Sequence, residues 1–189
     1  MRIDDQGWVS GVRCIASPNR DQRPPRSGIE LLVIHSISLP PDQFGGPEIA
    51  RFFTNRLDTT VHPYFAQLQG VKVSAHFLVR RDGTVIQFVP CRSRAWHAGA
   101  SSWQGRTRCN DFSIGIELEG SDFVPFTGHQ YAALVRLTRR LLRAYPIRHI
   151  AGHSDIAPGR KTDPGPYFEW ERYRNALRNS SGFLHHAVL

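Results

Sequence analysis

The stretch IELLVIHSIS, residues 29–38, is a continuous apolar run rich in β-branched side chains. A run of this kind predicts a strand that is buried on both faces of a sheet. The predicted strand ends at His35, and the Pro- and Gly-rich loop LPPDQFGG, residues 39–46, follows it. Sheet proteins often carry functional groups at such places, because the sheet holds them rigidly beside an accessible loop.

Two further β patterns accompany this strand. Residues 73–90, VSAHFLVRRDGTVIQFVP, predict a hairpin, because Asp82-Gly83 suits a two-residue turn between β-rich arms. Residues 112–120, FSIGIELEG, alternate between apolar and other side chains. The face opposite the apolar side chains consists of Ser113, Gly115, Glu117 and Glu119. Because two carboxylates lie there among small residues, we expect this face to form the floor of a cleft.

Helical patterns and one more strand complete the predicted elements. The helices are expected over 47–57, 128–145 and 168–177, and the strand over 147–152. Pro47 is favoured at the first position of a helix, and Thr127 with Gln130 forms a capping box for the second helix. Residues 1–29 are expected to be irregular.

The order of these elements predicts an α/β fold. We expect a single domain over 1–189, with a mixed central β-sheet flanked by helices, because the sequence contains neither repeats nor a linker. Its core is expected over about 7–178, and residues 179–189 are expected to form a loose tail, in which the pair His185-His186 is incidental.

The composition excludes several classes of protein. The 189 residues suffice for one compact domain, and 40% hydrophobic with 21% charged residues is ordinary for a soluble globular protein. The longest apolar runs are far below the ~20 residues of a membrane span, so no membrane partner is expected. The N-terminal sequence MRIDDQGWVSG lacks the apolar core of a secretory signal, which predicts a cytoplasmic protein.

The net charge of +8 raises the question of a nucleic-acid partner. The arginines are scattered, however, and the densest group has the spacing of a solvated helix face: Arg136, Arg139, Arg140 and Arg143. We therefore expect no nucleic-acid partner, and attraction of an acidic small molecule instead. The three cysteines are odd in number and widely spaced, which argues against disulfides and against a cysteine-ligated zinc site.

Residues 148–168, RHIAGHSDIAPGRKTDPGPYF, place His153 at the end of the last predicted strand, as His35 ends the first. Two imidazoles and one carboxylate are a standard ligand set for catalytic zinc, with a fourth position open for water. Either Asp155 or Asp163 could supply the carboxylate, and spacing alone does not choose between them. Lys161 favours Asp163, because residues i and i+2 of an extended segment face the same way.

Five stretches of the chain resemble the N-acetylmuramoyl-L-alanine amidases of the peptidoglycan-recognition type. They are LLVIHSISLPP (31–41), VSAHFLVRRDGTVIQFV (73–89), RAWHAG (94–99), RCNDFSIGIELEG (108–120) and GHSDIAPGRKTDPG (152–165). The similarity runs from about Gly7 to Tyr173. It implies the fold of the zinc amidases, with a mixed sheet and helices packed against it, and one Zn²⁺ per chain.

The resemblance also implies roles for individual residues. The metal ligands of the family fall on His35, His153 and Asp163, and its catalytic residues fall on Glu117 and Lys161. Glu117 is expected to take a proton from zinc-activated water and to deliver it to the leaving amine. Lys161 is expected to stabilise the oxyanion, because a flexible point charge suits a developing alkoxide.

The chain departs from the family at two positions. Ser36 follows the first ligand histidine where the family usually has asparagine, and we expect this shorter side chain to weaken a contact with the substrate. Ser154 follows the second ligand histidine where the family often has cysteine. Neither residue is an expected metal ligand.

The implied substrate is a muropeptide, cleaved between the lactyl group of (1,6-anhydro-)N-acetylmuramic acid and L-alanine during peptidoglycan recycling. Arg108, Lys72 and Arg106 are candidates for contact with its carboxylates. Trp96 and His97 are expected to line the cleft, and core packing is an equal alternative for Trp96. A monomer is expected. The alternative functions are an inactive peptidoglycan-binding module and a periplasmic amidase that acts on intact cell wall.

Overall fold

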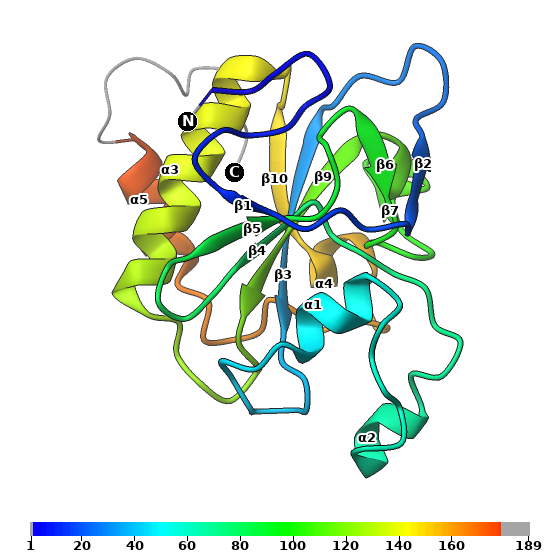
Figure 1. Ribbon diagram of the computed structural model, residues 1–189. Helices are drawn as coiled ribbons and strands as arrows, with labels where there is room; N and C mark the ends of the chain where they lie inside the picture. The colour runs from blue at the N-terminus through cyan, green and yellow to red at the C-terminus, as the bar shows by residue number, and fades with distance from the viewer. Residues whose placement is uncertain (1, 179–189) are drawn as a thin grey trace.

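The computed structural model describes residues 2–178 (Figure 1). A six-stranded mixed sheet forms the centre of the molecule, in the order β1-β5-β4-β9-β3-β10. Its strands are β1 (Arg13–Cys14), β3 (Leu31–Ile37), β4 (Phe77–Val79), β5 (Val85–Gln87), β9 (Ser113–Glu119) and β10 (His149–Gly152). The predicted α/β fold with a mixed central sheet is confirmed. The prediction of a loose tail over 179–189 lies outside the described residues.

The four strands β4, β9, β3 and β10 are neighbours and run parallel, whereas β5 is antiparallel to β4. Parallel strands are usually covered on both faces. All seven residues of β9 are buried, and so are the first five of β3. The prediction of a doubly buried strand around residue 33 is therefore confirmed, and β9 lies beside it in the middle of the sheet.

Helices and small sheets cover the two faces of the central sheet (Figure 1). One face carries α3 (Gly128–Ala144) and α5 (Trp170–Arg178). The other face carries α1 (Glu48–Phe53), α2 (Pro63–Ala66), α4 (His153–Ile156), the 3-10 helix η1 (Cys109–Asp111) and the two-stranded sheets β2 (Arg20–Gln22) with β6 (Ser93–Ala95) and β7 (Ser102–Trp103) with β8 (Arg106–Thr107).

The alternation along β9 assigns its two faces to different surroundings. Ile114 and Ile116 pack in one apolar cluster with Leu134 and Leu137 of α3. Glu117 points to the opposite side, where α1 covers only part of the sheet. The predicted capping box of α3 is present, with Thr127 accepting from the Gln130 amide and Gln130 accepting from the Thr127 amide.

Three predicted boundaries are wrong. The first strand does not end at His35, because pairing with β9 continues to Ile37. The helix α1 ends at Phe53 instead of residue 57, since Asn55 has a φ of 57°, which an α-helix cannot continue. The hairpin turn contains three residues, because Arg80 and Thr84 still pair and Gly83 takes a φ of 84°.

The prediction that residues 1–29 are irregular is also wrong in part. The short strands β1 and β2 lie in this segment and pair with β5 and β6. Strands of two and three residues carry no readable alternation, and their partners are distant in sequence. Within residues 2–178, no helix is both long and apolar enough to cross a membrane.

Candidate active site

Strand register brings the predicted site residues together. His35 of β3 pairs with Glu117 of β9, and Ile34 pairs with Gly152, the last residue of β10. His153 follows Gly152 directly and therefore lies level with His35. All three strands are parallel, so these residues meet at the carboxyl end of the sheet, where α/β proteins bind ligands.

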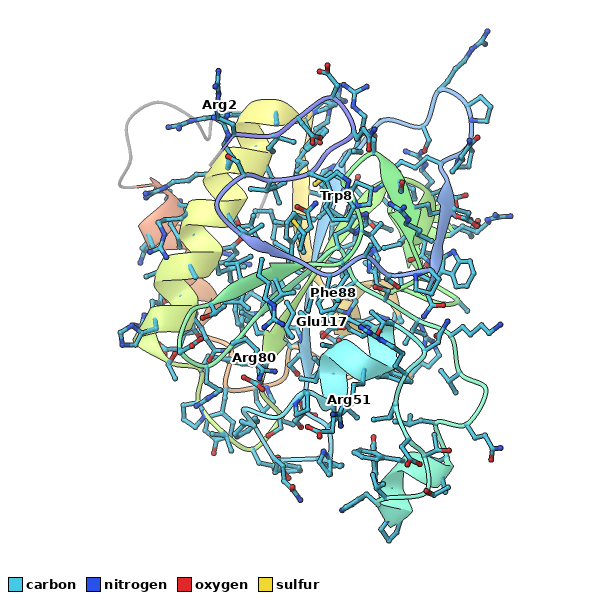
Figure 2. The ribbon with its side chains drawn as sticks, in the orientation of Figure 1. Arg2, Trp8, Arg51, Arg80, Phe88 and Glu117 are labelled. Carbon is cyan, nitrogen blue, oxygen red and sulfur yellow. The ribbon has the colours of Figure 1, made fainter. Side chains whose placement is uncertain are left out.

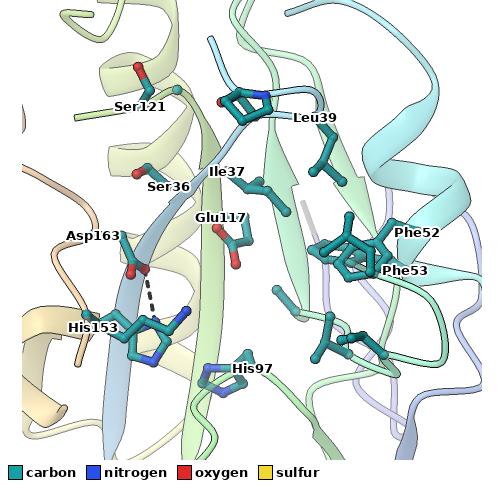
Figure 3. A pocket seen from close by; sticks show the side chains of 18 of the residues that line it. Ser36, Ile37, Leu39, Phe52, Phe53, His97, Glu117, Ser121, His153 and Asp163 are labelled. Carbon is teal, nitrogen blue, oxygen red and sulfur yellow. Dashed lines mark hydrogen bonds and ion pairs between the residues drawn. The ribbon is translucent and has the colours of Figure 1, made fainter. Parts of the chain in front are cut away.

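Three electron-rich atoms converge at this edge. Figure 3 shows the side chains of two of the residues, His153 and Asp163. The Nδ1 atoms of His35 and His153 are 3.0 Å apart, and Oδ2 of Asp163 lies 3.1 Å from the first and 3.0 Å from the second. One ion could contact all three atoms at the ~2.0–2.2 Å of zinc–ligand bonds. The cluster can therefore hold a metal ion.

The loop after β10 has a local structure that brings Asp163 back to His153. The amide of Ser154 donates to the carbonyl of Asp163 at 2.9 Å and closes the loop. Gly152 leaves room for Pro164, whose Cδ would lie 2.9 Å from a Cβ at residue 152. Asp155 instead accepts from the Gly152 amide at 2.7 Å and caps α4. The structure thus brings Asp163, and not Asp155, to the two histidines.

Hydrogen bonds at the far side of each imidazole orient the two rings. Nε2 of His153 lies 3.2 Å from the carbonyl of Ala98, so this nitrogen carries a proton and donates it. In the neutral ring, Nδ1 of His153 then presents a lone pair to Asp163 and His35. Nε2 of His35 lies 2.9 Å from Nδ1 of His97. A carboxylate that faces such a lone pair is repelled by it. A cation bound between them would remove this repulsion, so the arrangement fits a metal site.

Burial shifts the acid–base properties of these groups. Burial lowers the pKa of His35 to about 4, which keeps its ring neutral. Burial alone would raise the pKa of Asp163, but the close polar contacts of its Oδ2 with the imidazoles of His153 and His35 outweigh that effect and lower the pKa. Burial, followed by the charge of Asp163, raises the pKa of Glu117 well above its ordinary value, and Lys161 opposes this rise.

Glu117 lies in the interior of the molecule (Figure 2). Its Oε1 is 4.0 Å from Nδ1 of His35, and its Oε2 has no hydrogen-bond partner among the described residues. Glu119, two residues further along β9, is ion-paired with Arg80 at 3.3 Å instead. Glu117 is therefore the carboxylate of this strand that remains available beside the histidine–aspartate cluster.

A cavity of about 570 Å³ opens over this cluster. It is lined by the predicted residues Ser36, Trp96, His97, Glu117, His153, Lys161 and Asp163. Phe52 and Phe53 form an apolar wall opposite Asp163 and His153, and Glu117 projects between the two sides (Figure 3). The cavity thus joins titratable groups to an apolar surface, as ligand sites commonly do.

The three basic residues predicted to contact the substrate do not line this cavity. Arg108 is ion-paired with Asp111 at 3.2 Å, and Arg106 is ion-paired with Glu30 at 3.4 Å. Lys72 lines a smaller neighbouring hollow, which shares Phe52, Leu68 and Val71 with the cavity. These positions depend on packing between distant segments, which spacing in the sequence does not report.

Arg160, which no sequence pattern singled out, lines the cavity next to Lys161. Its guanidinium donates to the carbonyl of Ala98 at 2.9 Å and to that of Ala100 at 2.6 Å. Ala98 thus accepts from both Arg160 and His153. His76, near the site, is fully buried, and its Nδ1 accepts from the Gly115 amide at 3.1 Å.

Comparison with known proteins agrees with this fold and site. Residues 24–166 match the family model of the N-acetylmuramoyl-L-alanine amidases, named Amidase_2. The chain belongs to the N-acetylmuramoyl-L-alanine amidase family, as the resemblance predicted. Within this family it is 54% identical over 172 residues to the 1,6-anhydro-N-acetylmuramyl-L-alanine amidase AmpD of Escherichia coli strain K12, covering 90% of this chain and 94% of that protein.

Two solved structures extend the comparison. The crystal structure of a selenomethionine derivative of AmpD is 52% identical and superposes with a TM-score of 0.91, covering 94% of this chain and 99% of that one. The N-acetylmuramyl-L-alanine amidase AmiD of E. coli, in complex with the substrate anhydro-N-acetylmuramic acid-L-Ala-D-γ-Glu-L-Lys, is 32% identical with a TM-score of 0.57, covering 92% of this chain and 65% of that one.

Proposed function

We propose that this protein is a zinc-dependent amidase that cleaves the amide between the lactyl group of 1,6-anhydro-N-acetylmuramic acid and L-alanine in muropeptides. The observation that carries the proposal is the convergence of His35, His153 and Asp163 beside a buried Glu117. The 54% sequence identity to AmpD, in an alignment that covers 94% of that protein, supports the same substrate class.

His35, His153 and Asp163 would hold the zinc ion in this proposal. The chemistry that bound zinc supplies is the activation of water as a nucleophile near neutral pH. The backbone of the chain holds the three donors in place: β3 carries His35, α4 carries His153, and the closed loop carries Asp163. A water that enters this site lies within reach of Glu117.

Glu117 acts as general base and then as general acid. Its unpartnered Oε2 is free to accept a proton from the attacking water. Because burial raises the pKa of Glu117, the carboxyl group binds that proton well and can pass it to the leaving amine of L-alanine. A positioned proton transfer of this kind is worth ~10²–10⁴ in rate.

Lys161 stabilises the oxyanion that develops on the lactyl carbonyl oxygen. It lines the cavity on the loop that also carries Asp163, and it is exposed there to an incoming ligand. An ammonium group is a compact donor, and its interaction with the oxygen strengthens as negative charge grows in the transition state. Trp96 and the apolar wall of Phe52 and Phe53 provide a surface for the sugar.

The remaining expectations belong to the same proposal. One zinc ion binds per chain, and the protein acts as a monomer on small muropeptides in the cytoplasm. Lys72 is the basic residue outside the cavity that is best placed for the stem peptide, because its hollow borders the cavity. Arg108 and Arg106 are ion-paired with Asp111 and Glu30, but their side chains are exposed, and they stay candidates for contact with the stem peptide.

Mass spectrometry of the products from an anhydromuropeptide mixture tests the proposal. We expect release of the intact stem peptide and of the anhydro sugar bearing a free lactyl carboxylate. A chelator should abolish the reaction, and added Zn²⁺ should restore it. Tight binding without any turnover of the zinc-loaded protein would favour the inactive binding module, and cleavage at another bond would contradict the proposal.

A further inference from the structure

We propose that His97 is a positioning residue that fixes the ring orientation and tautomer of His35 for metal binding. Two residues of β9 support its ring: Ser113 contacts Nε2, and the ring packs on the backbone at Gly115. This inference rests on the proposed metal site. It adds a role toward the metal site to the expectation that His97 lines the cleft.

A chain of side-chain contacts connects β3 to β9 through His97. Nε2 of His35 lies 2.9 Å from Nδ1 of His97, and Nε2 of His97 lies 3.1 Å from Oγ of Ser113. The rings of His35 and His97 are perpendicular, with centroids 5.0 Å apart and an interplanar angle of 88°. Both ring nitrogens of His97 therefore face protein partners and are engaged before any ligand enters the cavity.

The order of protons along this chain follows from the metal site. A ligand nitrogen needs its lone pair, so a neutral His35 that binds a metal through Nδ1 carries its proton on Nε2. Nε2 then donates to Nδ1 of His97, which must accept and therefore carries its own proton on Nε2. That second proton is donated to the hydroxyl oxygen of Ser113. A partner at the far nitrogen of a ligand histidine sets its tautomer and increases its basicity.

The packing of the His97 ring on β9 explains why residues 113 and 115 of the alternating pattern are small. A Cβ at Gly115 would lie 2.5 Å from Cγ and Nδ1 of His97, so the ring lies directly on the strand backbone and only glycine fits below it. Ser113, two residues earlier, presents its hydroxyl on the same face. The space that the small side chains leave is thus filled in part by His97, and Glu117 borders the part that remains open.

The backbone of His97 is held as firmly as its ring. Oδ1 of Asn110 accepts from the amides of His97 at 3.1 Å and of Ala98 at 2.8 Å. The carbonyl of Ala98 in turn accepts from Nε2 of His153 at 3.2 Å. Residues 97 and 98 thus serve both ligand histidines, one through a side chain and the other through the backbone.

The dissociation constant for Zn²⁺, measured by competition with a chromophoric chelator on the full chain, tests this role without using activity. His97→Leu retains bulk but removes the acceptor, so we expect zinc to bind about 10–100-fold more weakly. His97→Asn offers its Oδ1 near the position of Nδ1 and should bind zinc within about fivefold of wild type. The matched control His149→Asn changes a half-buried histidine of β10 outside the chain of contacts and should leave the constant unchanged.

A second variant and a spectroscopic signature guard against misfolding. Ser113→Ala removes the last acceptor and should weaken zinc binding less than His97→Leu does. In the zinc-loaded wild type, ¹⁵N chemical shifts should show His97 as the Nε2–H tautomer. A His97→Leu variant with wild-type zinc affinity, an Asn variant as weak as the Leu variant, or His97 as the Nδ1–H tautomer would overturn the positioning role. A wild-type chain that binds no zinc would instead refute the proposed function, and this role with it.

Discussion

Two carboxyl groups of the cavity have opposite environments. The pKa of Glu117 is raised well above its ordinary value by burial and by the nearby charge of Asp163. The pKa of Asp163 is lowered, because its close polar contacts with the imidazoles of His153 and His35 outweigh burial. Pairs of groups whose environments separate their pKa values in this way often divide the acid–base roles of a site. In the proposed site, Asp163 would stay ionised as a ligand, and Glu117 could carry a proton.

Glu117→Gln tests the proton transfer. The amide keeps the shape of the side chain but cannot accept a proton, so kcat should fall by at least ~10². Metal analysis should still find one zinc per chain, and substrate should still bind. Glu171→Gln, which changes an exposed carboxylate of α5, serves as the control. Near-normal turnover of Glu117→Gln would contradict the role of Glu117 as general base and general acid.

The two aspartates of the loop after β10 should separate in a metal assay. Asp163→Ala removes a ligand, so zinc should be largely lost from the purified protein. Asp155→Ala removes only the cap of α4 and should cost about 0.5–2 kcal/mol of stability with the zinc retained. Zinc content and thermal unfolding, measured on both variants, check this contrast. Loss of zinc from Asp155→Ala alone would reverse the assignment.

Lys161→Ala tests the oxyanion role. An interaction that forms only in the transition state lowers kcat and kcat/KM together, here by roughly 10²–10³, with KM little changed. A lysine that binds a carboxylate of the stem peptide would raise KM and spare kcat. Steady-state kinetics of Lys161→Arg adds a second criterion, because the planar guanidinium suits a carboxylate better than a developing alkoxide. Wild-type kcat in the Arg variant would contradict the oxyanion role.

At the scale of elements, β9 performs two tasks with its two faces. Ile114 and Ile116 join the core under α3, while Ser113, Gly115 and Glu117 build the floor of the site. The strand is buried throughout, so the site rests on a part of the sheet that is packed from both sides. Stability and chemistry therefore depend on alternate residues of the same strand.

Thr127→Ala probes an element whose stability is separate from the chemistry. Oγ1 of Thr127 accepts from the Gln130 amide at 3.1 Å and donates to the carbonyl of Arg81 at 2.7 Å. Loss of this cap should lower the free energy of unfolding by about 0.5–2 kcal/mol, measured by denaturant titration. Both kcat and zinc affinity should remain unchanged. A tenfold loss of kcat in a folded variant would show that α3 influences the site.

At the scale of the whole molecule, the cluster of His35, His153 and Asp163 links segments that are far apart in the chain. His35 and Asp163 are separated by 128 residues, and His35 and His97 by 62. An ion bound by these groups binds only the folded protein, so its binding free energy adds to stability. Metal binding at this cluster is thus expected to stabilise the packing of β3 against the loop after β10.

Chelation measures this contribution. At a zinc concentration of 100 times Kd, bound metal adds about 2.7 kcal/mol, which for a protein of this size corresponds to a Tm shift of roughly 5–11 °C. Scanning calorimetry with and without chelator should show this shift in the wild type. His153→Ala should show no such response, because its site is incomplete. An equal response in that variant would place the stabilising metal elsewhere.

The sequence by itself determined the elements with strong local patterns. The apolar run of β3, the alternation of β9, the hairpin at Asp82-Gly83 and the capping box of α3 are all present, although the end of β3 and the length of the hairpin turn differ from the prediction. Local patterns succeed here because burial and backbone preference act over a few residues. Through the family resemblance, the sequence also predicted four residues that line one cavity, Glu117, His153, Lys161 and Asp163, and His35, which contacts two of them.

Tertiary structure alone decided what depends on register and distant packing. Among residues considered without the family, Asp155 and Asp163 were both candidates, and the closed loop brings Asp163 to the histidines while Asp155 caps α4. The position of His97 between His35 and Ser113, and the position of Arg108 outside the cavity, were likewise absent from any local pattern. The reason is physical: a side chain's partners are set by strand pairing and packing across the molecule, whereas a sequence pattern reports only its neighbours along the chain.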